Sequence, residues 1–421
     1  MSLKVAVVGI GRVGLPLAVV LSKYYDTIGL DKNKSLVEGL RRRELQLIEP
    51  RVREYIERYN PKFDTDLSKV SDCDIVFICV GTQAKGVGYS AKNVADVILE
   101  LEPYLQRPEQ LLVVVSTVPP GVFSGGIVPD RILSKIAGVC YNPTMISLGD
   151  AIRGFESPEY LVIGQSNPKA GHILEDFWST IIGRDVPVFK TSLEGAAVVK
   201  YGLNAALVLR ISMLSFLTEL CEKADADVDL ISSVLSHDSR ISGKKMLRGG
   251  LGFGGTCFPV DVEALITLCS DLGLDTNFMN AVKLLNQRQV ERSVEIVKSF
   301  GRKKVGVLGI TYKPNTDVVD NSQSLEIALA LAESGLEVTV YDPGGLDALR
   351  KLGYDSKLHL VSSVGEVLER SDIIFIGVDW PEFHNLKADD FRSDQVVIDP
   401  WRVLRDRALT CRYYGYGLVS S

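Results

Sequence analysis

Residues 249–261 combine a glycine-rich loop with a cysteine and an aspartate four residues apart. Five of the seven residues from 249 to 255 are glycine, which excludes helix or strand and indicates backbone packed closely around something. Cys257 follows the loop, and a helix pattern begins near Pro259. Because a helix N-terminus stabilises a thiolate, we expect Cys257 to be a nucleophile, with Asp261 within reach of the same face. A buried cysteine beside a flexible loop is the alternative.

A second glycine pattern, Gly9-x-Gly11-x-x-Gly14, follows a strand-like run and opens a helix pattern. These glycines allow a tight turn and let a pyrophosphate approach the helix N-terminus. Asp31 ends the next strand-like run, where a carboxylate would bind the adenosine ribose and repel a 2′-phosphate. We therefore expect NAD rather than NADP. Arg12 is either a solvated loop charge or an added pyrophosphate contact.

Lys200 and Asn204 are four residues apart in a long helix pattern and therefore share one face. A cation and an amide on an otherwise apolar surface indicate a site for an oxyanion or a sugar hydroxyl. The alternative is a lysine whose stem covers apolar surface, beside an asparagine that is simply hydrogen-bonded.

The scaffold for these residues is predicted by buried strand-like runs that alternate with helix patterns, at 5–9, 27–31, 74–80 and 111–116. This alternation is typical of a parallel sheet covered on both faces. The same order recurs about three hundred residues later, at 304–309, 338–342 and 372–378. We expect two doubly wound Rossmann-like α/β domains. The second lacks the glycine loop, so side chains such as Lys313 would have to bind a nucleotide there.

A long helix is predicted between the two repeats. Thr191 and Glu194 form a capping-box pattern, and the helix would run to about Lys223, a length of about 45 Å. Because it is apolar nearly all round, we expect it to be buried between domains and against a second subunit, with residues 196–220 in or beside a homodimer interface. A simple connecting helix is the alternative.

Bulk composition excludes several classes of protein. At 421 residues the chain is too long for one ordinary core, and its net charge of −6 gives no reason to expect nucleic acid or an anionic membrane as partner. No signal peptide precedes the first strand pattern, and Lys200, Asn204 and Arg210 interrupt the longest apolar stretch. The seven cysteines are scattered, with no CxxC pair. They indicate reduced thiols in the cytoplasm, and no metal site.

Over essentially its whole length the chain resembles the UDP-glucose/GDP-mannose dehydrogenase family. The matching segments are residues 9–15, 80–82, 116–119, 141–143, 200–204, 252–261, 313–317 and 379–383. The resemblance implies an NAD-binding domain at 1–190, a central helical domain that dimerises and carries the cysteine loop at 191–293, and a UDP-sugar-binding domain at 294–421.

The resemblance and the motifs together assign site residues. Catalytic roles are expected for Cys257, Asp261, Lys200, Asn204 and Thr117. NAD contacts are expected from Gly9, Gly11, Arg12, Val13, Gly14, Asp31, Val80, Gly81, Thr82, Ser116 and Thr117. UDP-sugar contacts are expected from Lys200, Asn204, Arg240, Arg248, Gly249, Phe253, Gly254, Lys313 and Arg402.

The implied reaction is the four-electron oxidation of UDP-glucose to UDP-glucuronate, a precursor for polysaccharides. Asp261 or a water bound to it would take the alcohol proton. Cys257 would trap the aldehyde as a thiohemiacetal, which is oxidised to a thioester and hydrolysed. Lys200 and Asn204 would stabilise the oxyanions, and Thr117 would position the water.

The chain departs from the family at several positions. The family has two glutamates after the Asn-Pro pair, whereas this chain has Thr144 and Leu148 at those positions. The residue that would act as the base in thioester hydrolysis is therefore open. Where the family has a lysine just before the aspartate, this chain has Val260. Where the family has an arginine in the C-terminal domain, this chain has Asp320. Arg12 would compensate for these lost charges near the cofactor.

Three other readings remain open. UDP-N-acetylmannosamine dehydrogenases also have valine at the position of Val260, although Phe253 and Phe258 favour the glucose branch. A two-electron hydroxyacid dehydrogenase would not need Cys257. A non-catalytic nucleotide-sugar-binding relative would not be expected to retain the four catalytic side chains of the helix and the cysteine loop together.

Overall fold

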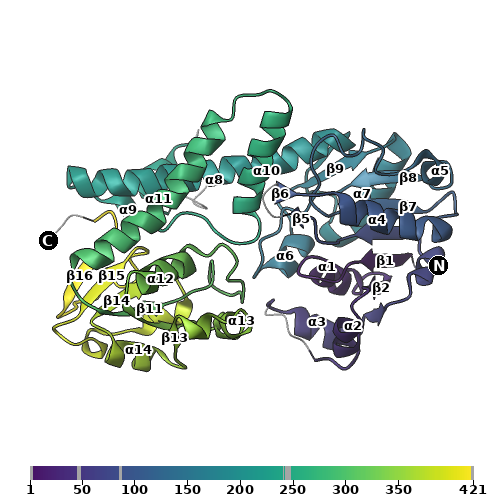
Figure 1. The fold of residues 1–421 in the computed structure, drawn as a ribbon. Coiled ribbons are helices and arrows are strands. Elements are labelled where there is room, and N and C mark those ends of the chain that lie inside the picture. The colour runs from purple at the N-terminus through teal and green to yellow at the C-terminus, as the bar shows by residue number, and fades with distance from the viewer. Residues whose placement is uncertain (1–2, 45–48, 85–87, 240, 242–247, 419–421) are drawn as a thin grey trace. The chain divides into compact units, whose positions relative to one another are not determined.

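The computed structural model describes residues 3–44, 49–84, 88–239, 241 and 248–418. The chain divides into two compact units, Met1–Leu203 (unit 1) and Asn204–Ser421 (unit 2). The boundary between the two units falls inside the longest described helix, α8 (Leu193–Ala224) (Figure 1).

Unit 1 is built on an eight-stranded sheet with the order β10-β9-β8-β7-β4-β1-β2-β3. Its strands are β1 (Lys4–Val8), β2 (Asp26–Leu30), β3 (Lys62–Asp64), β4 (Ile75–Ile78), β7 (Leu111–Val114), β8 (Gly138–Tyr141), β9 (Leu161–Gln165) and β10 (Val188–Ser192). The order from β3 to β8 is that of a dinucleotide-binding fold. The expectation of a parallel sheet holds for these six strands, whereas β9 pairs antiparallel to β8 and carries β10 with it. A short hairpin, β5 (Gln83–Ala84) and β6 (Gly88–Tyr89), follows β4.

Two apolar layers cover the two faces of this sheet, whose central strands β4, β7 and β8 are buried along their whole length. One layer contains α1 (Gly14–Leu21), α2 (Lys34–Arg41), α3 (Val52–Tyr59), α6 (Ala151–Glu156) and α7 (Pro168–Ile182). The opposite layer contains α4 (Lys92–Leu101), α5 (Asp130–Leu133) and the first turns of α8. All eight residues of α1 are buried, and the helix begins at Gly14, six residues after the end of β1.

Unit 2 contains the second sheet, of order β13-β12-β11-β14-β15-β16, in which every pair is parallel. Its strands are β11 (Lys304–Leu308), β12 (Glu337–Tyr341), β13 (His359–Leu360), β14 (Ile373–Ile376), β15 (Val396–Asp399) and β16 (Arg412–Gly415). Helices α12 (Gln323–Glu333) and α13 (Leu346–Lys351) contribute to the core on one face, and α14 (Val364–Arg370) to the core on the other. The strand order repeats that of β1 to β8, which confirms the two Rossmann-like domains.

The described part of unit 2 also contains a group of helices. It comprises the second part of α8, α9 (Val228–His237), and a hairpin of α10 (Phe258–Asp271) and α11 (Asn277–Ser299) (Figure 1). Arg292 of α11 is buried, pairs with both carboxylate oxygens of Glu222 on α8, and stacks 4.3 Å from the ring centroid of Tyr416. Glu222 also accepts the backbone N–H of Gly417 at 2.9 Å. This ion pair joins the helices to the C-terminal sheet.

The start of α8 differs from the expectation. The helix begins at Leu193, and the hydroxyl of Ser192 accepts the N–H of Gly195 at 3.0 Å, so the cap is Ser192 and the predicted Thr191–Glu194 box is wrong. The Glu194 carboxylate instead accepts the N–H groups of Gly121 and Ser124 at 2.6 and 2.7 Å. By length and hydropathy alone, α8 meets the criteria for a membrane-spanning helix. Within the chain, 33% of its most apolar window is buried.

The buried ion pair generates a stability prediction. Arg292→Leu should lower the free energy of unfolding by about 3–5 kcal/mol, because the Glu222 carboxylate would stay buried without its cation. Lys283→Leu breaks a more exposed pair with Glu263 and should cost less than about 1 kcal/mol. Urea unfolding of both variants checks this, and equal losses would contradict the assigned role of Arg292.

Candidate active site

The glycine turn after β1 has the geometry that a dinucleotide requires. Gly9 has φ +90°, and a Cβ there would lie 2.9 Å from the Cys79 carbonyl. A Cβ on Gly14 would lie 1.8 Å from the Gly9 carbonyl oxygen, whereas nothing lies within 4 Å of one on Gly11. Gly9 and Gly14 therefore shape the turn, and Gly11 leaves open space before the N-terminus of α1, which no side chain caps. This cradle fits a pyrophosphate.

The other expected cofactor residues cluster at the carboxyl ends of neighbouring strands. Asp31 follows β2 and accepts the N–H of Ile10 at 3.1 Å, which ties it to the glycine turn. Ser116 follows β7 and donates to the Val80 carbonyl at 2.7 Å. The remaining expected contacts lie on the same loops: half-buried Arg12, Val13 and Thr117, exposed Gly81 and buried Thr82. The two central loops, after β4 and β7, thus meet beside the glycine turn.

The second Rossmann-like domain has the matching aspartate, but in a buried position. Asp342 after β12 is buried, and its Oδ2 accepts the N–H groups of Ile310 and Thr311 at 2.6 and 2.9 Å. Trp380 Nε1 donates to the same oxygen at 3.2 Å. Internal bonds therefore occupy the carboxylate that would hold a ribose. Lys313 lies half-buried in the loop after β11, 5.5 Å from the ring centroid of Tyr312.

The two lost glutamates map to the loop between β8 and α6 in unit 1. Lys200 Nζ donates to the main-chain carbonyl of Thr144 at 2.8 Å. At the other end of the loop, the carboxylate of Glu49 accepts the N–H groups of Gly149 and Ala151 at 2.7 and 2.8 Å. Sequence reasoning missed Glu49, because its partners are main-chain groups about one hundred residues away.

In unit 2, Cys257 is the N-cap of α10, and Pro259 occupies the first turn. The thiol is exposed at the positive end of the helix dipole, 3.7 Å from the Thr256 hydroxyl. Asp261 lies one turn further along, where it is buried, and its N–H donates to the Cys257 carbonyl at 2.8 Å. The expected placement of a cysteine and a carboxylate on one helix start is present.

Asn204 is also buried and donates from Nδ2 to Asp261 Oδ2 at 2.5 Å. The structure thus joins two of the expected catalytic side chains, 57 residues apart in sequence. Since the amide donates to the carboxylate, it orients Asp261 beside the start of α10.

The glycine-rich loop packs against protein at each of its glycines. A Cβ on Gly249 would lie 2.1 Å from the Thr218 hydroxyl, and one on Gly250 would lie 2.3 Å from the Trp401 ring. Similar close contacts meet Gly252, Gly254 and Gly255, from Asn286, Asn321 and Tyr312. The loop therefore wraps side chains and backbone of its own unit.

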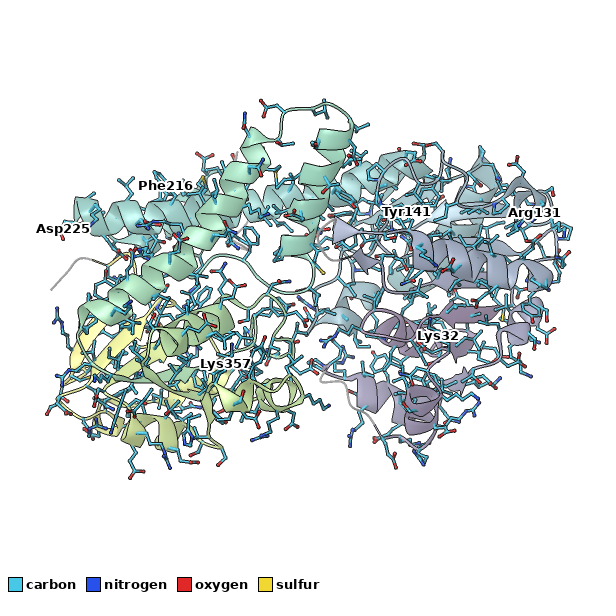
Figure 2. All side chains as sticks on the ribbon, viewed as in Figure 1. Lys32, Arg131, Tyr141, Phe216, Asp225 and Lys357 are labelled. Carbon is cyan, nitrogen blue, oxygen red and sulfur yellow. The ribbon has the colours of Figure 1, made fainter. Side chains whose placement is uncertain are left out.

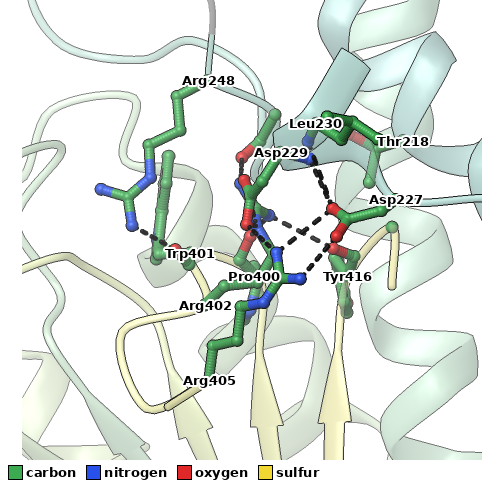
Figure 3. Close-up of polar contacts among 12 residues, drawn as sticks. Thr218, Asp227, Asp229, Leu230, Arg248, Pro400, Trp401, Arg402, Arg405 and Tyr416 are labelled. Carbon is green, nitrogen blue, oxygen red and sulfur yellow. Dashed lines mark hydrogen bonds and ion pairs between the residues drawn. The ribbon is translucent and has the colours of Figure 1, made fainter. Parts of the chain in front are cut away.

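Figure 3 shows two of the expected substrate arginines, Arg248 and Arg402. Arg402 is buried with φ +58° and donates to Asp229 at 2.9 Å, to Gly249 O at 2.9 Å and to Pro400 O at 2.6 Å. Arg405 pairs with Asp227 at 2.5 Å, which lowers the pKa of that carboxyl. These bonds hold Arg402 as an anchor between α9 and the start of the cysteine loop.

Arg248 is half-exposed and pairs with Asp379 and the Trp401 carbonyl. Asp379 lies in the expected 379–383 motif and also contacts His384 Nε2 at 2.6 Å. Arg240, another expected substrate contact, lies outside the described residues.

Among the seven cysteines, Cys257 alone is exposed. Burial raises the pKa of the Cys73 thiol to about 11 and that of Cys140 to about 12. Cys257 is thus the thiol best placed to react. Within the described ranges, no group of three or more His, Cys, Asp and Glu side chains could hold a metal ion.

Three family models match the chain in order. They describe the NAD binding domain of the UDP-glucose/GDP-mannose dehydrogenase family over residues 3–182, its central domain over 194–288 and its UDP binding domain over 306–406. NAD is therefore the cofactor of the first unit, in agreement with its glycine turn.

Relatives match along nearly the whole chain. A putative UDP-glucose 6-dehydrogenase of Bacillus subtilis, YtcA, is 31% identical over 421 residues that cover 96% of each chain. A UDP-glucose dehydrogenase from the archaeon Pyrobaculum islandicum has a TM-score of 0.89 at 28% identity, over 99% of this chain and 98% of the other. A UDP-D-ManNAc dehydrogenase of Pyrococcus horikoshii has a TM-score of 0.84 at 21% identity, over 99% of each chain, and supports the fold alone.

The position of Asp31 generates a prediction about cofactor choice. The ratio of kcat/KM with NAD to that with NADP should be on the order of 100 or more, because a 2′-phosphate would meet the Asp31 carboxylate. Asp31→Ala combined with Lys32→Arg should bring the ratio close to one, whereas Lys32→Arg alone should preserve it. Lys32 is the exposed neighbour labelled in Figure 2. Initial rates with both cofactors check this, and equal wild-type rates would overturn it.

Proposed function

Because the chain belongs to the UDP-glucose/GDP-mannose dehydrogenase family, we propose that it oxidises UDP-glucose at C6 to UDP-glucuronate in two successive steps. The observation that carries the proposal is the exposed Cys257 thiol at the start of α10, next to the Asn204–Asp261 pair. An oxidation that stopped at the aldehyde would need no nucleophile there.

The residues divide the chemistry among them. NAD bound in unit 1 supplies the hydride acceptor for both oxidations. Asp261, directly or through a water, accepts the proton of the C6 hydroxyl as the aldehyde forms. The Cys257 thiolate then adds to the aldehyde carbon and gives a thiohemiacetal, whose oxidation leaves a thioester on the sulfur. Water cleaves the C–S bond of the thioester and releases the carboxylate and the thiol.

Addition of the thiolate to the aldehyde and of water to the thioester each gives a tetrahedral oxyanion, and two donors are assigned to it. Asn204 has a buried amide that already donates to Asp261, which holds it in place. Lys200 brings a cation whose hydrogen bond to the Thr144 carbonyl limits its freedom without neutralising its charge. Such preorganised donors stabilise charge that develops in the transition state.

The UDP-sugar is assigned to unit 2, whose C-terminal part matches a UDP binding domain. Lys313, Arg248, Phe253 and Gly254 remain the proposed contacts from its described part. For Arg402, whose donors are engaged within the protein, a direct substrate contact would require breaking buried bonds.

A rival substrate is UDP-N-acetylmannosamine, since Val260 stands in the first turn of α10 where glucose-specific relatives have lysine. NADH formation from a panel of UDP- and GDP-sugars decides between them. Turnover of UDP-glucose alone supports the proposal, turnover of the N-acetyl sugar supports the rival, and none with any sugar supports a non-catalytic binding protein.

Loss of the two loop glutamates predicts slow thioester hydrolysis. Thr144 and Leu148 cannot accept a proton, so hydrolysis depends on Asp261, Thr117 and the water they hold. The first milliseconds to seconds should therefore show a burst of NADH that approaches two per active site, followed by slower turnover. Stopped-flow absorbance measures the burst. Leu148→Glu should accelerate the slow phase and leave the burst unchanged.

Cys257→Ser is the matched control for the covalent step, because it should abolish sustained turnover. A linear progress curve with one NADH per sugar and free aldehyde as product would falsify the four-electron mechanism.

The exposed apolar stripe of α8 predicts a homodimer. Met213, Phe216 and Leu220 are 40%, 52% and 49% exposed at helical spacing, and Phe216 is labelled on α8 in Figure 2. Such a stripe is characteristic of a subunit interface. Phe216→Asp with Leu220→Asp should convert a dimer into a monomer, whereas Leu99→Asp on α4 should not. Sedimentation velocity checks this; a wild-type monomer, or a protein that stays dispersed only in detergent, would refute it.

A further inference from the structure

One side chain holds the middle of the cysteine loop by both of its polar atoms. The N–H of Phe253 donates to Asn286 Oδ1 at 2.8 Å, and Asn286 Nδ2 donates to the Phe253 carbonyl at 2.9 Å. The preceding Gly252 has φ +94°, and a Cβ there would lie 2.3 Å from Asn286 Oδ1. The loop glycine and the asparagine of α11 therefore fit only as a pair.

Two residues around the start of α12 support the same contact. Gln323 is buried and donates from Nε2 to the Phe253 carbonyl at 3.2 Å and to the Asn286 carbonyl at 3.3 Å. Asn321, with φ +47°, donates to the Gly255 carbonyl at 3.1 Å. Main-chain groups of the loop on both sides of Gly254 are thus bonded to side chains from distant parts of unit 2.

Packing connects the contact between Asn286 and Phe253 to Cys257. Phe253 is buried and packs edge-on against Phe258, with ring centroids 6.4 Å apart. Phe258 is the first residue of α10 and directly follows Cys257. Both rings belong to the apolar cluster that contains Val262 and Val282. A shift of Phe253 would therefore move the start of α10, on which the thiol and Asp261 lie.

We propose that Asn286 is a positioning residue for Cys257. Its amide supplies one acceptor and one donor to a single main-chain residue, which an aspartate or an alanine cannot do. Cys257 lies four positions after Phe253, so loss of the Asn286 contact displaces the sulfur without removing any group that touches substrate. A displacement of about 1 Å can cost on the order of 100-fold in rate. The role in turnover rests on the proposed covalent oxidation, whereas the role in placing the thiol does not.

The test compares three variants of the full-length protein. Asn286→Ala removes both bonds, and Asn286→Asp is nearly isosteric and keeps only the acceptor for the Phe253 N–H. Asn280→Ala is the matched control, because Asn280 lies on the same helix and bonds to Thr276 rather than to the loop. The readouts are kcat, KM for NAD and for UDP-glucose, the rate of Cys257 alkylation by iodoacetamide followed by peptide mass spectrometry, and the folded fraction by circular dichroism.

We expect kcat to fall by about 10- to 100-fold in Asn286→Ala and by less in Asn286→Asp, with KM for NAD unchanged. The alkylation rate of Cys257 should change in the same order at full folded fraction. The proposal is overturned if both Asn286 variants behave like Asn280→Ala, or if the loss of kcat only follows the folded fraction. Inactivity on every sugar would overturn the proposed function. The alkylation rates would still test whether Asn286 positions Cys257, because alkylation needs no substrate.

Discussion

Steric exclusion along the glycine-rich loop is the constraint on which the course of the chain ahead of Cys257 depends. At all five glycines of residues 249–255 a Cβ would lie between 2.1 and 2.5 Å from neighbouring atoms, so only glycine lets the chain pass between α8, α11 and the C-terminal sheet. The loop leads to Cys257, which is the N-cap of α10 and has an exposed thiol.

Side chains from elsewhere in unit 2 hold the main chain of this glycine-rich loop in place. Glycine is the least restrained residue, yet here Arg402 bonds the Gly249 carbonyl, Asn286 bonds Phe253, and Asn321 bonds the Gly255 carbonyl. Each anchor comes from a different part of unit 2. The course of this loop therefore relies on side chains from distant parts of the sequence.

The two Rossmann-like domains show how one topology is used in two ways. Both have the same strand order and an aspartate after the second strand. In the first, the carboxylate of Asp31 borders an open glycine turn and can accept from a ribose. In the second, Asp342 is buried and bonded to Ile310, Thr311 and Trp380. The two carboxylates differ in burial, because Asp31 is half-buried whereas Asp342 is buried.

What the sequence determined by itself was local or repeated. The glycine turn with Asp31, the cysteine before a helix, the repeated strand order and the long helix all follow from short-range patterns, because turns, caps and strands are set by neighbouring residues. The tertiary structure alone decided the long-range partners: Asn204 with Asp261, Asn286 with Phe253, and Glu49 with Gly149. It also placed the helix cap at Ser192 instead of Thr191, reversed β9 and β10, and committed Arg402 to Asp229. Many of these partners are main-chain amides and carbonyls. Since almost every residue carries both groups, no side-chain pattern predicts which of them will be bonded.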